Sequence, residues 1–517
     1  MPRKSSKQAS IQQVNMVLNG GLNYAQSRAN IADNELTRAI NFIYDPATDF
    51  LVTRPGTDCI TAAALPSPIT KGYYYEVSST EAYHVCAAGK KLYYITSADP
   101  LGTAWTEVGT NLLTGTYTPS FLTFNKLLLI ADGDAAGIKS WAGAVGGAIS
   151  TGITSSPSAT ALVVIKNRVV ANSITDLDLV TFSAPNDASN TGWNTTTTAV
   201  ALRAGYGDLL NVNAFGVFGD DLIVSKVGSS EKRLYRVNVA SATTTSWYVQ
   251  NLSENNAAQN AQSMTSAWNN VFLVDTNGFK SLKGVTEYGD IQVDSVGRKI
   301  NTVFLQDYTC DFVSYLPSYN AVWFNIGERI FCYTERYDPS SGKTIPAFTD
   351  LNFKWGRCTS VYEAGDVVYM TGYNGYLYMI DEDLATDETS PAVTANYLAA
   401  VRTKTLTFFV DGILRKLEFY LKPKATGTGH IYVCTDEQTK TTLKSITVDQ
   451  ESTYLYDETG FLNDANEYLY DTGSSPWVET SRNRLRHDEM AFELELSTGR
   501  CGVEWCKAEI ALLEGGE

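Results

Sequence analysis

Histidine, methionine and long apolar runs are scarce in this chain. Its 517 residues include three histidines and six methionines, and charged residues make up 19% of it, below the roughly 25% of ordinary globular chains. A dense apolar run such as Leu127–Ala131 is far shorter than the ~18 residues that a membrane helix needs. The basic first residues lack the apolar stretch of a secretory signal. We therefore expect no membrane anchor and no secretory leader.

The scarcity of histidine also limits the chemistry that the sequence can support. His84, His430 and His487 lie far apart in the sequence and belong to no Ser–His–Asp or histidine–metal motif. The chain has no G-x-S-x-G, P-loop or H-E-x-x-H pattern. The sequence thus predicts that the protein is not an enzyme and has no catalytic, cofactor-binding or metal-binding residues.

Basic residues are in the minority as well. The chain has 40 Lys and Arg against 56 Asp and Glu, a net charge of −16. Proteins that bind nucleic acid generally use Lys and Arg to displace counterions from phosphates, so the balance argues against a general nucleic-acid binder. The eight cysteines form no Cys-x-x-Cys pair, and we expect free, mostly buried thiols. A disulfide between Cys501 and Cys506 stays open as an alternative.

What the sequence does contain is a repeat of short apolar strands. Their centres are 42 to 53 residues apart, in the range of β-propeller blades, which have four strands and run about 40–50 residues. The strands are expected at 82–88, 125–131, 166–173, 219–226, 268–276, 318–326 and 364–372.

A second strand follows most of these after a tight turn. Asn277-Gly278 and Asn374-Gly375 are dipeptides that two-residue hairpin turns prefer. An assortment of β-sandwiches is the alternative, but the spacing favours a propeller of six or seven blades over residues 60–390. Because a propeller must hide its sheet edges, we expect an N-terminal strand such as Phe50–Thr53 to pair with the last blade.

The chain after residue 390 has a different pattern. Segments 404–424 and 430–436 are longer strands with turn signals, notably Asp411-Gly412, and 490–514 alternates apolar and polar residues around Thr498-Gly499. We interpret 391–517 as a separate β-sandwich-like domain.

Two features of this domain suggest an interface with another subunit or a partner. Residues 451–471 carry six acids and no base, with matching Tyr-Leu-Tyr segments, and an arginine row follows on alternating positions. Pairing of that row with the acidic segment of the same chain is the alternative. The predicted interface residues are Tyr454, Tyr456, Tyr468, Tyr470, Arg482, Arg484 and Arg486.

The N-terminal segment, residues 1–59, carries a recognisable order of motifs. Asp33 or Asn34 is expected to cap a short helix with Leu36, Ala39 and Ile40, followed by two short strands and a turn. The order is Gly-Gly-apolar-Asn, then I-x-D-N-E-L, then an asparagine on a strand, then Arg-Pro-Gly. The matching positions are Gly20, Gly21, Leu22, Asn23, Ile31, Asp33, Asn34, Glu35, Leu36, Asn41, Arg54, Pro55 and Gly56.

This order resembles the start of many bacteriophage virion proteins. Together with the propeller and the C-terminal β-domain, it resembles the tail nozzle, or packaged-DNA stabilisation, proteins of short-tailed phages. The resemblance implies a hexameric ring in the virion tail, assembled in the host cytoplasm, that continues the DNA channel below the portal and adaptor. It also implies that the ring retains the packaged genome and passes it during ejection without specific binding. The implied partners are further copies of the chain, the tail adaptor or head-to-tail connector, and tail spikes, fibres or a needle.

A different function remains open beside this one. Residues 97–105, SADPLGTAW, resemble the Asp box of sialidase-type propellers with one extra residue before the glycine. That box staples a turn remote from the active site, so it indicates architecture rather than catalysis. The alternative is a receptor- or glycan-binding propeller of a phage tail, and a third possibility is an intracellular propeller scaffold.

Overall fold

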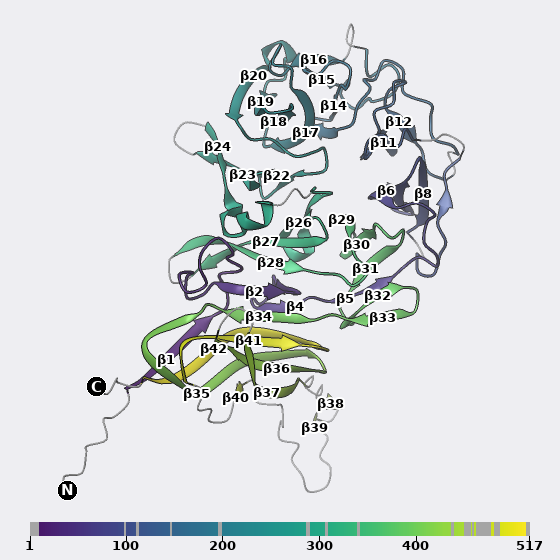
Figure 1. Ribbon diagram of the computed structural model, residues 1–517. Helices are drawn as coiled ribbons and strands as arrows, with labels where there is room; N and C mark the ends of the chain where they lie inside the picture. The colour runs from purple at the N-terminus through teal and green to yellow at the C-terminus, as the bar shows by residue number, and fades with distance from the viewer. Residues whose placement is uncertain are drawn as a thin grey trace, which may run out of the picture.

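The computed structural model describes residues 10–97, 100–109, 113–144, 147–194, 199–285, 290–305, 309–338, 342–435, 439–448, 456–457, 460–461, 477–479 and 486–512. Nearly all regular structure in this part of the chain is β-strand (Figure 1). No helix among these residues is long and apolar enough to cross a bilayer. The fold is therefore all-β, as predicted.

Residues 69–381 form a β-propeller whose blades are antiparallel sheets. The first three blades are β6 (Ile69–Ser78), β7 (Glu81–Ala88), β8 (Lys91–Thr96), β9 (Thr106–Glu107); β10 (Ser120–Phe124), β11 (Leu127–Ala131), β12 (Lys139–Trp141); and β13 (Leu162–Ile165), β14 (Arg168–Asn172), β15 (Leu179–Phe182), β16 (Val200–Arg203). The next three are β17 (Asn211–Phe218), β18 (Asp221–Val227), β19 (Lys232–Asn238), β20 (Tyr248–Glu254); β21 (Met264–Ala267), β22 (Asn270–Asp275), β23 (Gly278–Val285), β24 (Asp290–Asp294); and β25 (Val313–Leu316), β26 (Ala321–Ile326), β27 (Arg329–Asp338), β28 (Lys343–Leu351). A last sheet contains β29 (Cys358–Ala364), β30 (Val367–Gly372) and β31 (Leu377–Asp381).

The blades close into a ring (Figure 1). The innermost strands β6, β10, β13, β17, β21, β25 and β29 contact one another in this order, and β29 contacts β6. The seven apolar strands predicted from the sequence are the second strands of these sheets, β7, β11, β14, β18, β22, β26 and β30. The repeat exists because each blade buries the same strand between its neighbours, so the same apolar pattern recurs.

Six blades are built from consecutive strands, and the seventh is completed by the N-terminal segment. β5 (Gly56–Cys59) pairs antiparallel with β31, Tyr378 opposite Cys59 and Asp381 opposite Gly56. The strand predicted for this role, Phe50–Thr53, is wrong. β4 (Leu51–Thr53) pairs instead with β3 (Phe42–Tyr44) and β42 (Arg500–Leu512) of the C-terminal sheet. The Arg54-Pro55 bend separates the two strands, which allows them to join different sheets.

The C-terminal region forms two sheet layers that share one apolar core and are joined where β35 (Leu406–Ala425) pairs with β41 (Arg486–Leu496). One contains β35 (Leu406–Ala425), β42, β4, β3, β1 (Ser10–Val17) and β40 (Trp477–Glu479). The other contains β34 (Ala399–Thr403), β36 (Gly427–Cys434), β37 (Lys440–Val448) and β41 (Arg486–Leu496). Buried Leu417 and Phe419 of the first belong to the same cluster as Ile431 and Phe492 of the second, as in a sandwich.

The sandwich and the propeller are continuous through a sheet. β28 of blade six pairs with β2 (Leu36–Ile40), β2 pairs with β34, and β34 pairs with β41. The sheet of blade seven likewise extends beyond β5 to β32 (Thr386–Ser390) and β33 (Val393–Asn396). Backbone hydrogen bonds therefore cross the boundary between the two parts, and Figure 1 shows them stacked directly on each other.

Two local predictions are wrong. The helix expected to carry Leu36, Ala39 and Ile40 is strand β2, because its backbone is paired with β28 and β34 and tertiary pairing overrides helix propensity. Asp411-Gly412 lies inside β35 rather than in a turn. It falls at a register shift between Thr407 and Gly412, just where β35 begins to pair with β42, Gly412 opposite Leu512. All eight cysteines are buried and free, including Cys501 and Cys506, which both lie on β42.

Candidate functional site

A cavity of about 340 Å³ opens at the face of the propeller where the innermost strands begin. It is lined by strand starts and by the loops that lead into them from blades one to six, so it lies at the mouth of the central channel. We call it the channel-mouth cavity. Its lining is dominated by amide and hydroxyl side chains, which are Thr70, Thr118, Thr160, Asn172, Ser173, Asn211, Asn213, Gln259, Asn260 and Gln262.

Buried polar residues at the ends of the second strands hold this face together. Six of the seven second strands have an almost fully buried polar residue at, or within one position of, their last residue. These residues are Asp132, Asn172, Lys226, Asp275, Asn325 and Thr371. Since a buried polar group costs free energy unless it is hydrogen-bonded, each of these positions fixes a loop at the channel mouth.

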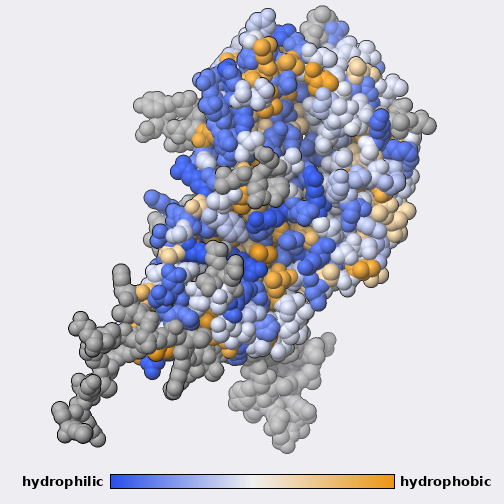
Figure 2. Space-filling model, viewed as in Figure 1, coloured by the Kyte–Doolittle hydropathy of each residue, from blue (hydrophilic) through white to orange (hydrophobic). Residues whose placement is uncertain are grey.

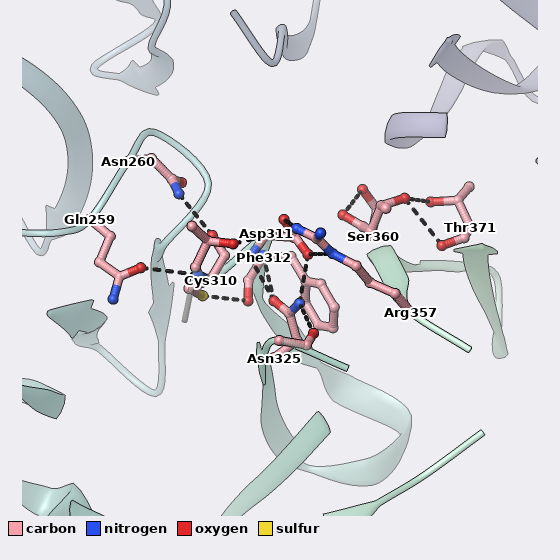
Figure 3. Close-up of polar contacts among 12 residues, drawn as sticks. Gln259, Asn260, Cys310, Asp311, Phe312, Asn325, Arg357, Ser360 and Thr371 are labelled. Carbon is pink, nitrogen blue, oxygen red and sulfur yellow. Dashed lines mark hydrogen bonds and ion pairs between the residues drawn. The ribbon is translucent and has the colours of Figure 1, made fainter. Parts of the chain in front are cut away.

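Asn172 in blade three and Asn325 in blade six accept equivalent pairs of backbone hydrogen bonds. The Oδ1 atom of Asn172 accepts hydrogen bonds from the backbone N–H groups of Thr160 and Ala161, at 2.8 and 2.9 Å. The Oδ1 atom of Asn325 accepts from the N–H groups of Asp311 and Phe312, at 2.7 and 3.1 Å (Figure 3). Each asparagine thereby sets the path of the chain into the innermost strand of its own blade.

Amide side chains also link successive blades around the mouth. Asn172 Nδ2 donates to the carbonyl of Val212 at 2.8 Å, and Asn213 Nδ2 donates to the carbonyl of Ala258 at 2.7 Å. Gln259 Oε1 accepts from the N–H of Cys310 at 3.0 Å, and Asn260 Nδ2 donates to the Cys310 carbonyl at 2.8 Å (Figure 3).

One contact reaches from blade five to blade two. Gln262 Nε2 donates to the carbonyl of Pro119 at 3.3 Å. These bonds connect the blades by side chains in addition to the packing of their sheets, so the cavity has a fixed shape.

The carboxylate that lines the cavity is already paired. Asp311 receives two hydrogen bonds from Arg357, at 2.7 Å from Nε and 2.5 Å from Nη2 (Figure 3). The Arg357 guanidinium also lies over the ring of Tyr373, 5.4 Å from its centroid. Arg357 leads into the innermost strand of blade seven, so the ion pair joins blades six and seven and neutralises the charge at the wall.

Lys71 adds a cation near the same wall. It lies on β6 next to Thr70 and is half-buried. Burial lowers the pKa of its ammonium group to about 8, and the nearby Cys310 and Asp311 oppose this shift. The lysine thus keeps most of its charge at pH 7 while lying in a poorly hydrated environment.

The loop that precedes Asn211 presents two apolar side chains to solvent. Tyr206 is 79% exposed and Leu209 is 81% exposed, and Leu209 has φ +59°, a strained conformation for a branched residue. The loop is held by the fully buried Lys226, whose ammonium group donates to Asp178 at 2.7 Å and to Asp208 at 2.5 Å. Figure 2 shows apolar side chains on the propeller surface in the region of β16 and β20. The two exposed side chains on this fixed loop are accessible to another molecule.

A second polar cluster lies at the junction of propeller and sandwich. Arg54 is 1% exposed and donates to both carboxylate oxygens of Asp387, at 2.8 and 2.6 Å. Its guanidinium lies between the rings of Phe353 and Tyr397, 4.2 and 3.8 Å from their centroids. Asn41 accepts from Arg54 Nε at 3.0 Å and from the Asn352 N–H at 2.8 Å. The residues of the N-terminal motif therefore act here as a structural clasp between the two parts.

The predicted interface residues are only partly described. Tyr456 is on the short strand β38 (Tyr456–Asp457), which pairs with β39 (Gly460–Phe461), and Arg486 begins β41 with its backbone opposite Ile413. Tyr454, Tyr468, Tyr470, Arg482 and Arg484 lie outside the described residues. Whether these side chains form an interface stays a prediction.

Sequence reasoning missed the buried polar residues at the ends of the second strands, although a signal for them was present. A polar residue at or near the end of an apolar strand recurs with the blade period, as in Asn172, Lys226, Asp275 and Asn325. A polar residue at the end of an apolar strand is normally interpreted as the start of a solvated loop. Its role in fixing the loop is seen only from its burial in the fold. Within the described part of the chain, no group of three or more His, Cys, Asp or Glu side chains is placed to hold a metal ion.

Comparison with known proteins gives similarity at the level of whole propeller structures. No family model and no curated protein matches the chain. A virginiamycin B lyase structure from Staphylococcus aureus aligns with TM-score 0.40 and 10% identity over 60% of this chain and 94% of that one. A coronin WD40 domain from Toxoplasma gondii gives TM-score 0.36 and 9% identity over 63% and 86%. The Cps50 (Swd1) β-propeller domain from Myceliophteria thermophila gives 0.37 and 9% over 62% and 98%. Similarities this weak carry no information on the ligand or activity of this chain.

Proposed function

We propose that the chain is a structural subunit of a bacteriophage tail, the building block of a hexameric nozzle ring that continues the DNA channel. The observation that carries the proposal is the fusion of propeller and sandwich into one body. β2 joins blade six to the sandwich by backbone hydrogen bonds, and the Arg54–Asp387 pair closes the junction from inside. A wall that resists the pressure of packaged DNA needs this kind of stiffness between its parts.

Two separate contact surfaces support a role in assembly. One is the loop with Tyr206 and Leu209 on the propeller. The other is the outer face of β1, where Ile11 is 55% and Val17 is 48% exposed while Met16 on the opposite face is buried in the core. A subunit of a tail needs contacts with its copies and with the components above and below it, and exposed apolar groups at two places suit that need.

β1 also has a free sheet edge. Among the described residues it pairs with β42 alone, over the full length Ser10–Val17. An unpaired edge of eight residues is a template for a strand of another chain. Val17 lies opposite Trp505 in this ladder, and Trp505 packs near Tyr420 on the next strand, 6.2 Å between ring centroids. We call the outer face of β1, together with its unpaired edge, the β1 face. We assign the β1 face to the contact between ring neighbours.

Net charge suits a conduit that does not hold its cargo. The chain carries −16 at pH 7, and a ring of such subunits repels phosphates on average. DNA then slides through without being bound at particular sites.

Assembly state is the experimental test. Six copies of the 56.5-kDa chain form a ring of about 340 kDa, which light scattering after size-exclusion chromatography detects, alone and with a tail adaptor. The double variant Ile11→Lys/Val17→Lys should reduce ring formation, and the charge-matched control Leu101→Lys/Tyr248→Lys, at two other exposed apolar positions, should not. A chain that stays monomeric with its adaptor and is missing from virions contradicts the proposal.

A further inference from the structure

The channel-mouth cavity has the composition of a ligand site rather than of a solvent channel. Its volume of about 340 Å³ lies at the small end of ligand pockets, which span about 300–1,000 Å³. Apolar side chains from Ile174, Leu177 and Val212 alternate with the amides and hydroxyls of the wall. Such a wall offers donors and acceptors on fixed positions, together with apolar contact area.

Several polar groups of the wall are available to a ligand. Asn211 is exposed, and its side-chain amide makes no hydrogen bond within the described part of the chain. Gln259 uses Oε1 on the Cys310 N–H, which leaves its Nε2 as a donor (Figure 3). The Oδ1 atom of Asn213 is buried and has no hydrogen-bond partner among the described residues. An amide provides both a donor and an acceptor, as the hydroxyl groups of a sugar require.

An aromatic side chain stands at the rim. Tyr117 lines the cavity and is 46% exposed. Its ring packs against the backbone at Gly133, where a Cβ atom would lie 2.5 Å from the ring. A half-exposed ring that is packed on one side offers an apolar face and a polar hydroxyl tip, which matches the C–H face and the hydroxyl edge of a pyranose.

The charges favour a neutral ligand. No lysine, arginine or histidine is among the residues that line the cavity, and Arg357 already occupies both oxygens of Asp311. Lys71 lies close to Asp311 but outside this lining. An anion in the cavity would find no cation among the lining residues, because Arg357 is committed to Asp311.

We propose that the channel-mouth cavity binds the end of a neutral carbohydrate chain, one or two sugar units deep, with Tyr117 stacked on a ring and Asn211 and Gln259 bound to its hydroxyl groups. This site lies on the propeller, whereas the β1 face lies on the sandwich. The inference is thus independent of ring assembly and adds a glycan contact to the proposed function.

The test begins with the full-length chain on an array of neutral and acidic glycans of bacterial surfaces. Titration calorimetry then measures the strongest neutral hit with the wild type and with Tyr117→Ala and Asn211→Ala. We expect each variant to bind at least about tenfold more weakly with an unchanged melting temperature, since both residues are exposed. Tyr248→Ala, at an exposed tyrosine on β20, is the matched control and should bind like the wild type.

A second measurement makes a negative array result decisive. Glucose, galactose, mannose and N-acetylglucosamine at about 100 mM, enough for a site with millimolar Kd, should shift the NMR resonances of Tyr117 in the chain labelled at tyrosine. No neutral hit on the array together with no such shift overturns the proposal. Binding confined to acidic glycans, or binding that Tyr117→Ala and Asn211→Ala leave intact, overturns it as well.

Discussion

Arg54 and Asp387 lie 333 residues apart in the chain and meet in a buried pair with two hydrogen bonds of 2.8 and 2.6 Å. The pair brings the bend after β4 against β32, and Tyr397 of the approach to the sandwich covers the guanidinium. This contact thus adds a buried ion pair to the strand pairings that join the first and last parts of the fold. This arrangement explains why an Arg-Pro-Gly turn is needed here. Arg54 points into the junction, and Gly56 begins the strand that closes the propeller.

Removal of one partner of this pair should strongly destabilise the protein. In Arg54→Met or Asp387→Asn the remaining group stays buried without its counterpart, which typically costs about 3–5 kcal/mol. Chemical denaturation followed by tryptophan fluorescence measures the loss. The control Arg203→Met removes the exposed pair with Asp176, and its effect should be too small to resolve. Equal effects of the two arginine substitutions would contradict the role of the clasp.

The closing strand should tolerate no side chain at Gly56. A Cβ atom there would lie 2.1 Å from the carbonyl oxygen of Thr386 and 2.8 Å from the Leu384 Cβ. Gly56→Ala therefore forces β5 away from β31 or from residues 384–386, at a cost of roughly 1–3 kcal/mol. Hydrogen exchange of the β31 amides should accelerate with the loss of stability. Unchanged protection there would show that β5 does not hold the last blade.

Glu493 should make the sandwich sensitive to acid. Burial alone raises the pKa of this carboxyl, but Arg402 and Arg38 outweigh burial and lower the pKa to about 2. The folded pKa lies below the ordinary value of 4.5, so this contribution to stability is complete above pH 4.5 and is lost as the pH falls toward 2. Unfolding free energies measured between pH 6 and 3 should fall in the wild type. Glu493→Gln should be less stable than the wild type at pH 6, and its unfolding free energy should fall less between pH 6 and 3. Parallel pH profiles of the two proteins would show that Glu493 is not the cause of the acid sensitivity.

His84 should give the ring closure a second, milder pH dependence. It lies on β7 against Tyr362 and Tyr369 of blade seven, and its Nε2 atom is buried without a hydrogen-bond partner among the described residues. Burial lowers its pKa to about 4 from 6.5. The contribution of the neutral His84 imidazole to stability is therefore complete above pH 6.5 and decreases as the pH falls through 6.5 toward 4. His84→Phe should remove this part of the profile, measured by thermal unfolding at pH 7.5 and 5. If the variant keeps the wild-type slope, the histidine is not the cause.

Sequence reasoning reaches the propeller because its strands bury the same positions in every blade. The seven second strands were predictable for that reason. The turn at Asn374-Gly375 was predictable from its Asn-Gly dipeptide, and Gly375 has the positive φ that such a turn uses. The pairing of strands that lie far apart in the sequence was not predictable. Leu36–Ile40 becomes a strand only because β28 and β34 lie beside it. The pairing of Gly56–Cys59, rather than Leu51–Thr53, with β31 depends on the buried bend at Arg54. The channel-mouth cavity was not predictable for the same reason. From the sequence alone, Asn172 and Asn325 cannot be told from residues of solvated loops, and only the closed propeller buries them.

The proposal that the chain is a subunit of a phage tail nozzle is tested most directly by cryo-EM of virus particles from the source whose genome encodes it. We expect six copies in a ring below the portal and adaptor, around the DNA channel, with the β1 face of each subunit at the boundary with its neighbour. Absence of the chain from the particle, or single copies at fibre or spike tips without a ring, would contradict it.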